Sequence, residues 1–114
     1  MAVIAGSNLL SNFSCPAAEE CFDTLAEAAG TRIERIVSFG QSTPAGQWYD
    51  QLQDEWVLLV SGGAGILIEG EQAERRLAPG DWLLLPARCR HRVEWTSPGE
   101  NTVWLAVHFA GGAS

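Results

Sequence analysis

The chain has 114 residues, long enough for one domain with a single hydrophobic core and too short for two. Hydrophobic residues make up 46% and charged residues 18%, which is typical of a globular protein rather than a disordered one. The formal net charge of −7 disfavours nucleic acid and an anionic membrane as partners. No apolar stretch is long enough to span a bilayer.

The cysteines and the N-terminal segment bear on the cellular compartment. Cys15, Cys21 and Cys89 are odd in number and form no paired framework, which predicts a reducing environment. Residues 1–10 are mildly apolar but lack a basic region and are interrupted by Gly-Ser-Asn, so they do not resemble a signal peptide. We therefore expect a cytoplasmic protein.

The first elements in chain order are an arm and an ambiguous segment. We expect residues 1–18 to be an irregular arm, 19–110 to be the folded domain and 111–114 to be a tail. Residues 21–29 have apolar side chains at helical spacing. Gly30-Thr31 and the strand-like run that follows suit a hairpin instead, so we favour a strand here.

From residue 31 onward, short β-rich runs alternate with turns rich in Gly and Pro. The runs are TRIERIVSF, QWYDQ, EWVLLV, GILIEG, AERRLA, DWLLLP, RHRVEW and TVWLAVHF. Short strands at this spacing predict an all-β sandwich or barrel with antiparallel strands.

Side-chain alternation predicts which strands have a polar face. Ile33 contrasts with its neighbours Arg32 and Glu34, and in RHRVEW alternation places His91, Val93 and Trp95 on one face. The runs EWVLLV, DWLLLP and VWLAVHF are instead apolar on both faces. Because one face of an antiparallel sheet normally meets water, a second surface must cover these strands. We expect a homodimer, with coverage by the N-terminal arm as the alternative.

Two fragments place polar residues at a recognisable spacing. Glu55 is followed after six residues by Gly62, and Gly80 is followed after five residues by Pro86 and, five positions later, by His91. These fragments resemble the end of the first cupin motif, G-x5-H-x-H-x3-4-E-x6-G, and the second, G-x5-P-x-G-x2-H-x3-N. The resemblance spans roughly residues 31–109 and implies a small single-domain jelly-roll barrel of the cupin superfamily.

The chain departs from both cupin motifs where the metal ligands belong. Depending on the spacing before the motif glutamate, the paired histidines fall on Trp48 and Asp50, or on Tyr49 and Gln51. The motif glycine after the proline is Arg88, and the closing asparagine is Trp95. The metal-binding motif is therefore degenerate and retains two of the four implied ligands, Glu55 and His91.

The resemblance implies a cavity at the barrel mouth. The residues expected to bind a ligand there are Trp48, Tyr49, Asp50, Gln51, Glu55 and His91. For a metal, Glu55 and His91 are joined by Asp50 or Gln51, or by His108 in a triad of two histidines and one carboxylate. Such a set favours Mn²⁺, Fe²⁺ or Mg²⁺ over Zn²⁺; the alternative is that no metal is bound.

Two functions follow from this site. The first is a barrel that binds a small polar ligand or a metal, and the loss of both paired histidines favours it. The alternative is a metal-dependent enzyme of the dioxygenase or isomerase type with a substituted ligand set. His108 has its own alternative as a buried core or interface histidine.

Overall fold

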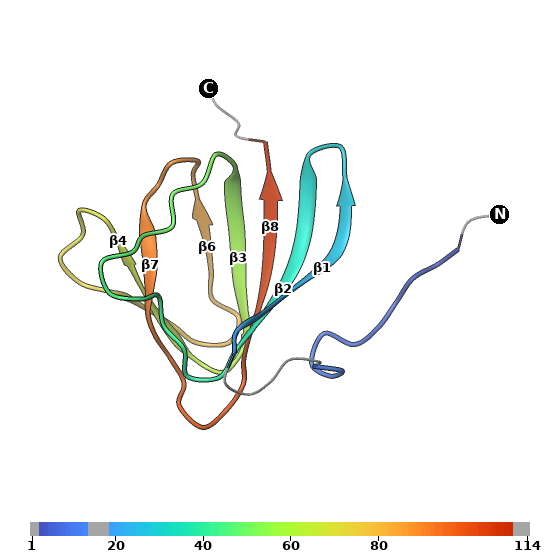
Figure 1. Cartoon of the computed structure of the whole chain (residues 1–114), viewed down its shortest axis with the longest axis horizontal. Helices are drawn as coiled ribbons and strands as arrows, with labels where there is room; N and C mark the ends of the chain where they lie inside the picture. Colours follow the sequence, from blue (N-terminus) through green and yellow to red (C-terminus); the bar gives the residue numbers. More distant parts are fainter. Residues whose placement is uncertain (1–2, 14–18, 111–114) are drawn as a thin grey trace.

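A computed structural model describes residues 3–13 and 19–110, which fold into eight β-strands and no helix. In chain order, the strands are β1 (Cys21–Ala28), β2 (Thr31–Ser38), β3 (Asp54–Ser61), β4 (Ala64–Ile68), β5 (Arg75–Leu77), β6 (Trp82–Leu85), β7 (His91–Thr96) and β8 (Thr102–Phe109). They form two antiparallel sheets, β1-β2-β8-β3-β6 and β5-β4-β7, the two walls of a barrel (Figure 1). The expected all-β jelly roll is confirmed.

The segment before Gly30 is a strand, as the hairpin signal predicts. Ala28 pairs with Thr31 across a two-residue turn formed by Ala29 and Gly30. Both turn residues have positive φ, 49° and 81°. This geometry matches the right-handed twist of the paired strands, and so it joins β1 and β2 tightly.

The face of β2 that carries Arg32 and Glu34 points into the barrel, and the face that carries Ile33 and Arg35 points out. Arg32, Glu34 and Ile36 line the interior, whereas Arg35 lies on the outer face. The polar side chains of Arg32 and Glu34 therefore face the interior, because that side of the strand borders a cavity. The outer face requires a different cover.

Two expectations about individual strands are wrong. The register of β7 against β4 slips by one residue between Val93 and Trp95. Trp95 consequently leaves the face of His91 and lies opposite Gly65, where its indole donates a hydrogen bond to Glu74. The run QWYDQ is also not a strand, since Tyr49 alone pairs there, in an isolated bridge with His91.

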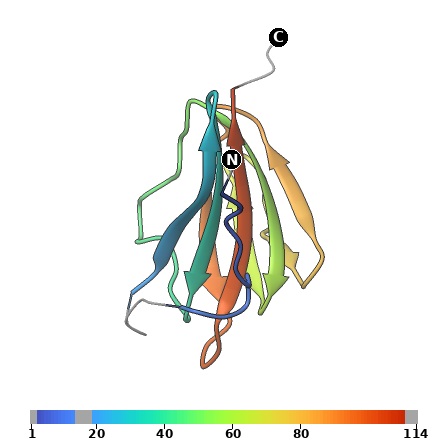
Figure 2. The same cartoon turned by 90° about the vertical axis from the view of Figure 1, so that its right-hand side faces the viewer.

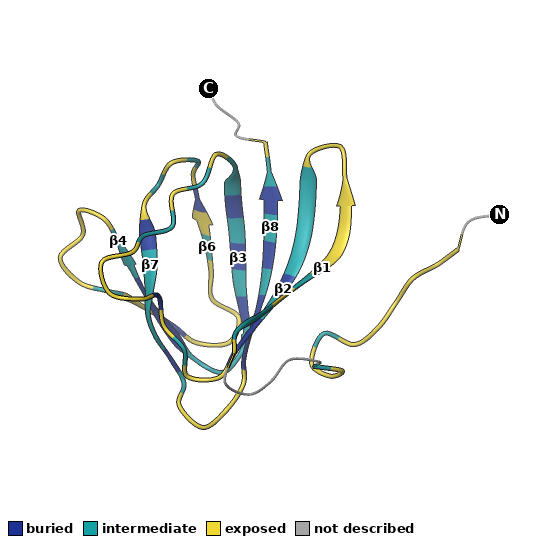
Figure 3. Ribbon diagram, viewed as in Figure 1, coloured by how far each residue is buried: buried dark blue, intermediate teal, exposed yellow. Residues whose placement is uncertain are grey.

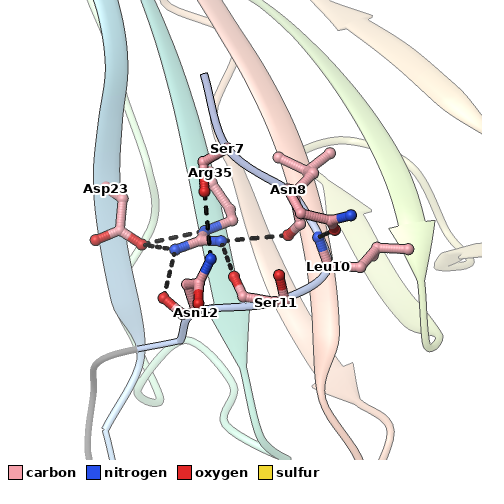
Figure 4. Close-up of polar contacts among 8 residues, drawn as sticks. Ser7, Asn8, Leu10, Ser11, Asn12, Asp23 and Arg35 are labelled. Atoms are coloured by element: carbon pink, nitrogen blue, oxygen red, sulfur yellow. Dashed lines mark hydrogen bonds and ion pairs between the residues drawn. The ribbon is translucent and has the colours of Figure 1, made fainter. Parts of the chain in front are cut away.

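The N-terminal arm is fixed to the outer face of the larger sheet by one buried arginine. Arg35 donates hydrogen bonds to the carbonyl oxygens of Leu9, Ser11 and Asn12, at 3.3, 2.8 and 3.3 Å (Figure 4). Its guanidinium also pairs with Asp23 at 2.9 Å. Residues 3–13 form no helix or strand; the other residues of the expected arm, and the tail 111–114, lie outside the described ranges.

Burial is greatest on the central strands. β3 and β8 carry much of the core, whereas β1 and β6 at the sheet edges are largely exposed (Figure 3). The core joins both sheets and consists of Val57, Leu59, Ala64, Ile66, Leu77, Leu85, Trp104 and Ala106. No helix in the described part is long and apolar enough to cross a membrane.

The cysteines differ from the expectation of unpaired thiols. Cys21 is disulfide-bonded, whereas Cys89 is free. Burial raises the pKa of the Cys89 thiol. The inference of a reducing compartment rested on unpaired cysteines, so Cys21 does not support it.

Candidate functional site

A cavity of about 220 Å³ lies inside the barrel, beside the core. Its charged and polar lining consists of Glu20, Arg32, Glu34, Tyr49, Gln51, Glu55, His91 and His108. Its apolar lining consists of Phe22, Ile36, Val57, Ile66, Leu85, Val93 and Trp104. The volume is below the roughly 300–1,000 Å³ of pockets for drug-sized ligands. The cavity therefore suits a small molecule.

Strand register brings the polar groups of the larger sheet into one row. His108 on β8 lies directly opposite Arg32 on β2 and Glu55 on β3. Four residues along the same strands, Ile36, Trp104 and Leu59 form the corresponding apolar row. At about 3.3 Å per residue, the two rows are about 13 Å apart. The polar row and the apolar row therefore lie at different levels of the barrel interior.

Glu55 is the central carboxyl group of this row and is only 7% exposed. Its Oε1 lies 3.7 Å from Nε2 of His91, and its Oε2 lies 3.9 Å from Nε2 of His108. The pKa of Glu55 is raised to about 7, mainly by burial and also by the nearby Glu34, while Arg32 opposes both effects. Near neutral pH, the carboxyl group can therefore either donate or accept a proton.

His91 approaches Glu55 from the smaller sheet, and a hydrogen bond at Nδ1, on the ring edge away from Glu55, holds its ring in place. Its Nδ1 lies 3.0 Å from the carbonyl oxygen of Cys89. Because a carbonyl only accepts hydrogen bonds, the neutral ring carries its proton on Nδ1 and presents a lone pair at Nε2. Burial lowers the pKa of His91, while the bond to Cys89 partly offsets this effect. The neutral ring therefore faces the carboxyl group as an acceptor.

The gaps around Glu55 are too long for direct hydrogen bonds. Distances of 3.7 and 3.9 Å exceed the limit of about 3.2 Å for a good bond. His108 lies closer to Glu34, with its Nε2 at 3.3 Å from Oε1. One bridging oxygen or nitrogen atom can bond both Glu55 and His91. The space between Glu55 and His91 can therefore be bridged by one polar atom.

Tyr49 forms one wall next to this pair. Its ring stacks on His91 with centroids 5.4 Å apart, and its backbone bonds to the same residue in both directions, at 2.7 and 3.1 Å. Burial raises the pKa of the phenol, Glu20 and Glu55 add to the effect, and a hydrogen bond with Thr43 opposes it. Tyr49 therefore stays a neutral phenol and holds the orientation of the imidazole.

Alternation along the segment before β3 divides the expected ligand-binding residues. Tyr49 and Gln51 line the cavity, together with Glu55, His91 and His108. Trp48 and Asp50 do not line it. Trp48 lies beneath Arg90 and Arg92, with its ring centroid 5.6 and 5.9 Å from their guanidinium carbons. Asp50 pairs with Arg88 at 2.9 Å. Successive residues of an extended segment point to opposite sides, which explains the division.

The sequence reasoning did not identify Glu20, Arg32 and Glu34 as cavity residues. Glu20 directly precedes β1, and Arg32 and Glu34 lie on β2; all three line the cavity. The available signal was the polar alternation of Arg32 and Glu34, which was interpreted as a solvent-facing surface. Its inward direction follows from the pairing of β2 with the histidine-bearing strand β8.

The donor atoms have the right chemistry for a metal but not the right placement. Two imidazoles and three carboxyl groups reach the cavity, a set that divalent ions accept. Across residues 3–13 and 19–110, however, no three His, Cys, Asp or Glu side chains converge so that they could hold an ion. Asp50 is committed to its arginine partner. As placed, these residues do not fit a metal.

At the degenerate motif position, Arg88 keeps the backbone conformation of a glycine. Its φ is 65°, in the left-handed region that glycine adopts most easily. Its amide donates a hydrogen bond to the carbonyl of Gln51 at 2.7 Å. The turn of the cupin motif thus survives the loss of its glycine and links the two segments that carry the site.

Comparisons with known proteins agree with this architecture. No family model and no curated protein matches the chain. A crystal structure from Ralstonia eutropha JMP134, named a "putative mannose-6-phosphate isomerase", is 54% identical, with a TM-score of 0.90, and the match covers 94% of this chain and 99% of that one.

More distant structures share the fold. A cupin superfamily protein from Desulfitobacterium hafniense DCB-2 is 19% identical over 86% of this chain and 84% of its own, with a TM-score of 0.70. An RmlC-like cupin with a double-stranded β-helix fold from Methanocaldococcus jannaschii is 14% identical over 88% of each chain, with a TM-score of 0.68. Together with the motif fragments and the barrel, these matches show that the chain has the fold of the cupin superfamily.

Proposed function

We propose that the barrel binds a small polar molecule that is uncharged or cationic, with one hydroxyl or amine group held between Glu55 and His91. The observation that carries this proposal is the 3.7 Å gap between their side-chain atoms, both buried and neither hydrogen-bonded to the other. A bridging group would satisfy both.

The charges of the cavity favour one class of ligand. Three carboxyl groups, those of Glu20, Glu34 and Glu55, face a single guanidinium, that of Arg32. A phosphate or carboxylate ligand would be repelled by this excess, whereas a hydroxyl or ammonium group would be attracted. Small polyols and amines are therefore the ligand classes to test first.

Calorimetric titration can test the proposal. Glycerol, erythritol, a neutral monosaccharide, ethanolamine, glycerol phosphate and Mn²⁺ are titrated separately into the purified protein. We expect binding by a polyol or amine and at least a tenfold loss of affinity in Glu55→Gln and His91→Asn. Asp50→Asn, outside the cavity lining, is the matched control and should bind normally. Preferred binding of glycerol phosphate that is unaffected by Glu55→Gln would contradict the proposal.

A second candidate is a metal-dependent isomerase with a substituted ligand set. The observation favouring it is the 54% identity with a structure named for mannose-6-phosphate isomerase activity. The assay is turnover of mannose 6-phosphate with and without added Mn²⁺, Fe²⁺ or Mg²⁺. Metal-dependent turnover that is lost in Glu55→Gln would support the enzyme, whereas a protein that binds a polyol but shows no turnover would support the binding barrel.

A further inference from the structure

The carboxyl group of Glu55 has one imidazole facing each of its oxygens. Oε1 lies 3.7 Å from Nε2 of His91, and Oε2 lies 3.9 Å from Nε2 of His108. All three side chains are buried, and both gaps exceed the limit of about 3.2 Å for a good hydrogen bond. A single polar group between Glu55 and His91 fills the first gap and leaves the second one open.

The two imidazoles present opposite hydrogen-bonding characters to these gaps. His91 offers a lone pair at Nε2, because its proton is on Nδ1, next to the carbonyl oxygen of Cys89. Nε2 of His108 lies 3.3 Å from Oε1 of Glu34, and an ionised carboxyl group only accepts hydrogen bonds, so this ring carries its proton on Nε2. A ligand group beside His91 must therefore donate, and a ligand group beside His108 must accept.

Hydroxyl groups meet both requirements, because each can donate one hydrogen bond and accept another. The first hydroxyl donates to His91 and accepts the proton that Glu55 holds. The second accepts from His108 and donates to the other carboxyl oxygen of Glu55. Burial is the main cause that raises the pKa of Glu55 to about 7, so this carboxyl group carries the required proton in a large share of molecules near neutral pH. An ammonium group has no lone pair and could not take the place beside His108.

The two hydroxyl positions lie next to each other. Oε1 and Oε2 of Glu55 share one carbon atom, so groups that bond to them are neighbours. Glu55 and His108 are paired on β3 and β8, which run side by side in the larger sheet (Figure 2). Hydroxyls on adjacent carbons, pointing to the same side, match this arrangement. The carbon atoms that carry them would contact the apolar part of the lining, which includes Val57, Ile66 and Trp104.

We propose that the ligand of this cavity is a compact vicinal diol, with one hydroxyl between Glu55 and His91 and the other between Glu55 and His108. The inference rests on the proposed function and narrows it from any small polar molecule to one with two hydroxyls on adjacent carbons. A molecule with one hydroxyl leaves one of the two gaps empty. A diol whose oxygens point to opposite sides cannot reach both oxygens of one carboxyl group.

Calorimetric titration near neutral pH tests this with three ligands of similar size: cis-1,2-cyclopentanediol, trans-1,2-cyclopentanediol and cyclopentanol. We expect the cis diol to bind about tenfold more tightly than either of the others, which is the effect of one or two added hydrogen bonds. A cis diol that binds no more tightly than cyclopentanol or the trans diol overturns the inference and leaves the proposed function standing. If none of the three binds, the inference is overturned too, and the titrations with polyols and amines decide the proposed function separately.

Nitrogen NMR of the imidazoles assigns the two hydroxyls. The chain has two histidines, so each ring can be followed separately. The cis diol should shift the Nε2 resonances of both rings, whereas cyclopentanol should shift one. His108→Asn, which lacks the Nε2 position, should lose the preference for the cis diol, and Asp50→Asn, outside the cavity lining, should keep it. If His108→Asn does not fold, the wild-type spectra decide: a cis diol that shifts His91 alone overturns the proposal.

Discussion

Replacing Glu55 with glutamine should change how stability depends on pH. The pKa of Glu55 is raised from 4.5 to about 7, mainly by burial. At about 1.4 kcal/mol per pKa unit, ionising this group in the folded protein costs about 3 kcal/mol more than in the unfolded chain. For a domain with a typical stability of about 5–15 kcal/mol, that is a large share.

The sign follows from where the proton is held. Between pH 4.5 and about 7 the folded state keeps a proton on Glu55 that the unfolded chain has lost, so the stabilising contribution falls as pH rises through this window. His91 acts in the opposite direction, because its lowered pKa makes the protein less stable as pH falls below 6.5. Because both proteins contain His91, subtracting the stability of one from that of the other cancels most of the effect of His91 on the pH dependence.

Urea denaturation of both proteins from pH 4 to pH 8 measures this difference. At pH 4 the two should agree to within about 1 kcal/mol, since a protonated carboxyl and an amide have similar shape and polarity. At pH 8 the glutamine variant should be more stable by about 3 kcal/mol. Parallel curves across the whole range would refute the assignment of a buried, proton-holding Glu55.

Three further predictions concern other parts of the molecule. Gly65→Ala should lower the free energy of unfolding by about 1–3 kcal/mol, because a Cβ there would clash with the Trp95 indole, whereas Gly6→Ala, in open space, should change it by less than about 0.5 kcal/mol; urea denaturation compares them. The chain has one tyrosine, so ultraviolet titration should show Tyr49 ionising above pH 10, and at a lower pH in Glu55→Gln than in wild type. Arg35→Met should speed proteolysis within residues 3–13 at least tenfold without opening the barrel. Cleavage of residues 3–13 at the same rate in the variant and in wild type would contradict the role of Arg35 as the anchor of the arm.

Sequence patterns were sufficient for the fold but only partly for the site. The alternation of short strands and turns predicted an all-β barrel, and Glu55 and His91 face one cavity as their motif spacing implied. The spacing could not show that β2 turns its polar face inward, because inside and outside depend on which strands close the barrel. Glu34 was missed for this reason.

Local irregularities account for the other differences. One extra residue in β7 moves Trp95 to the opposite face, and a single slip of this kind leaves no reliable mark in a pattern of alternating residues. Trp48 and Asp50 were grouped with Tyr49 and Gln51 because the motif spacing was ambiguous by one residue. In an extended segment, one residue is the difference between lining the cavity and facing away from it.

The inward polar face of β2 would link the lifetime of the protein to the ligand proposed above. An interior that contains Arg32, Glu34 and Glu55 contributes less to folding than an apolar interior of the same size. A molecule that binds there stabilises the folded state by an amount that rises with the logarithm of its concentration. Cells that lack the ligand would then hold a larger unfolded fraction, which proteases remove, so the abundance of this barrel would report the supply of the compound it binds.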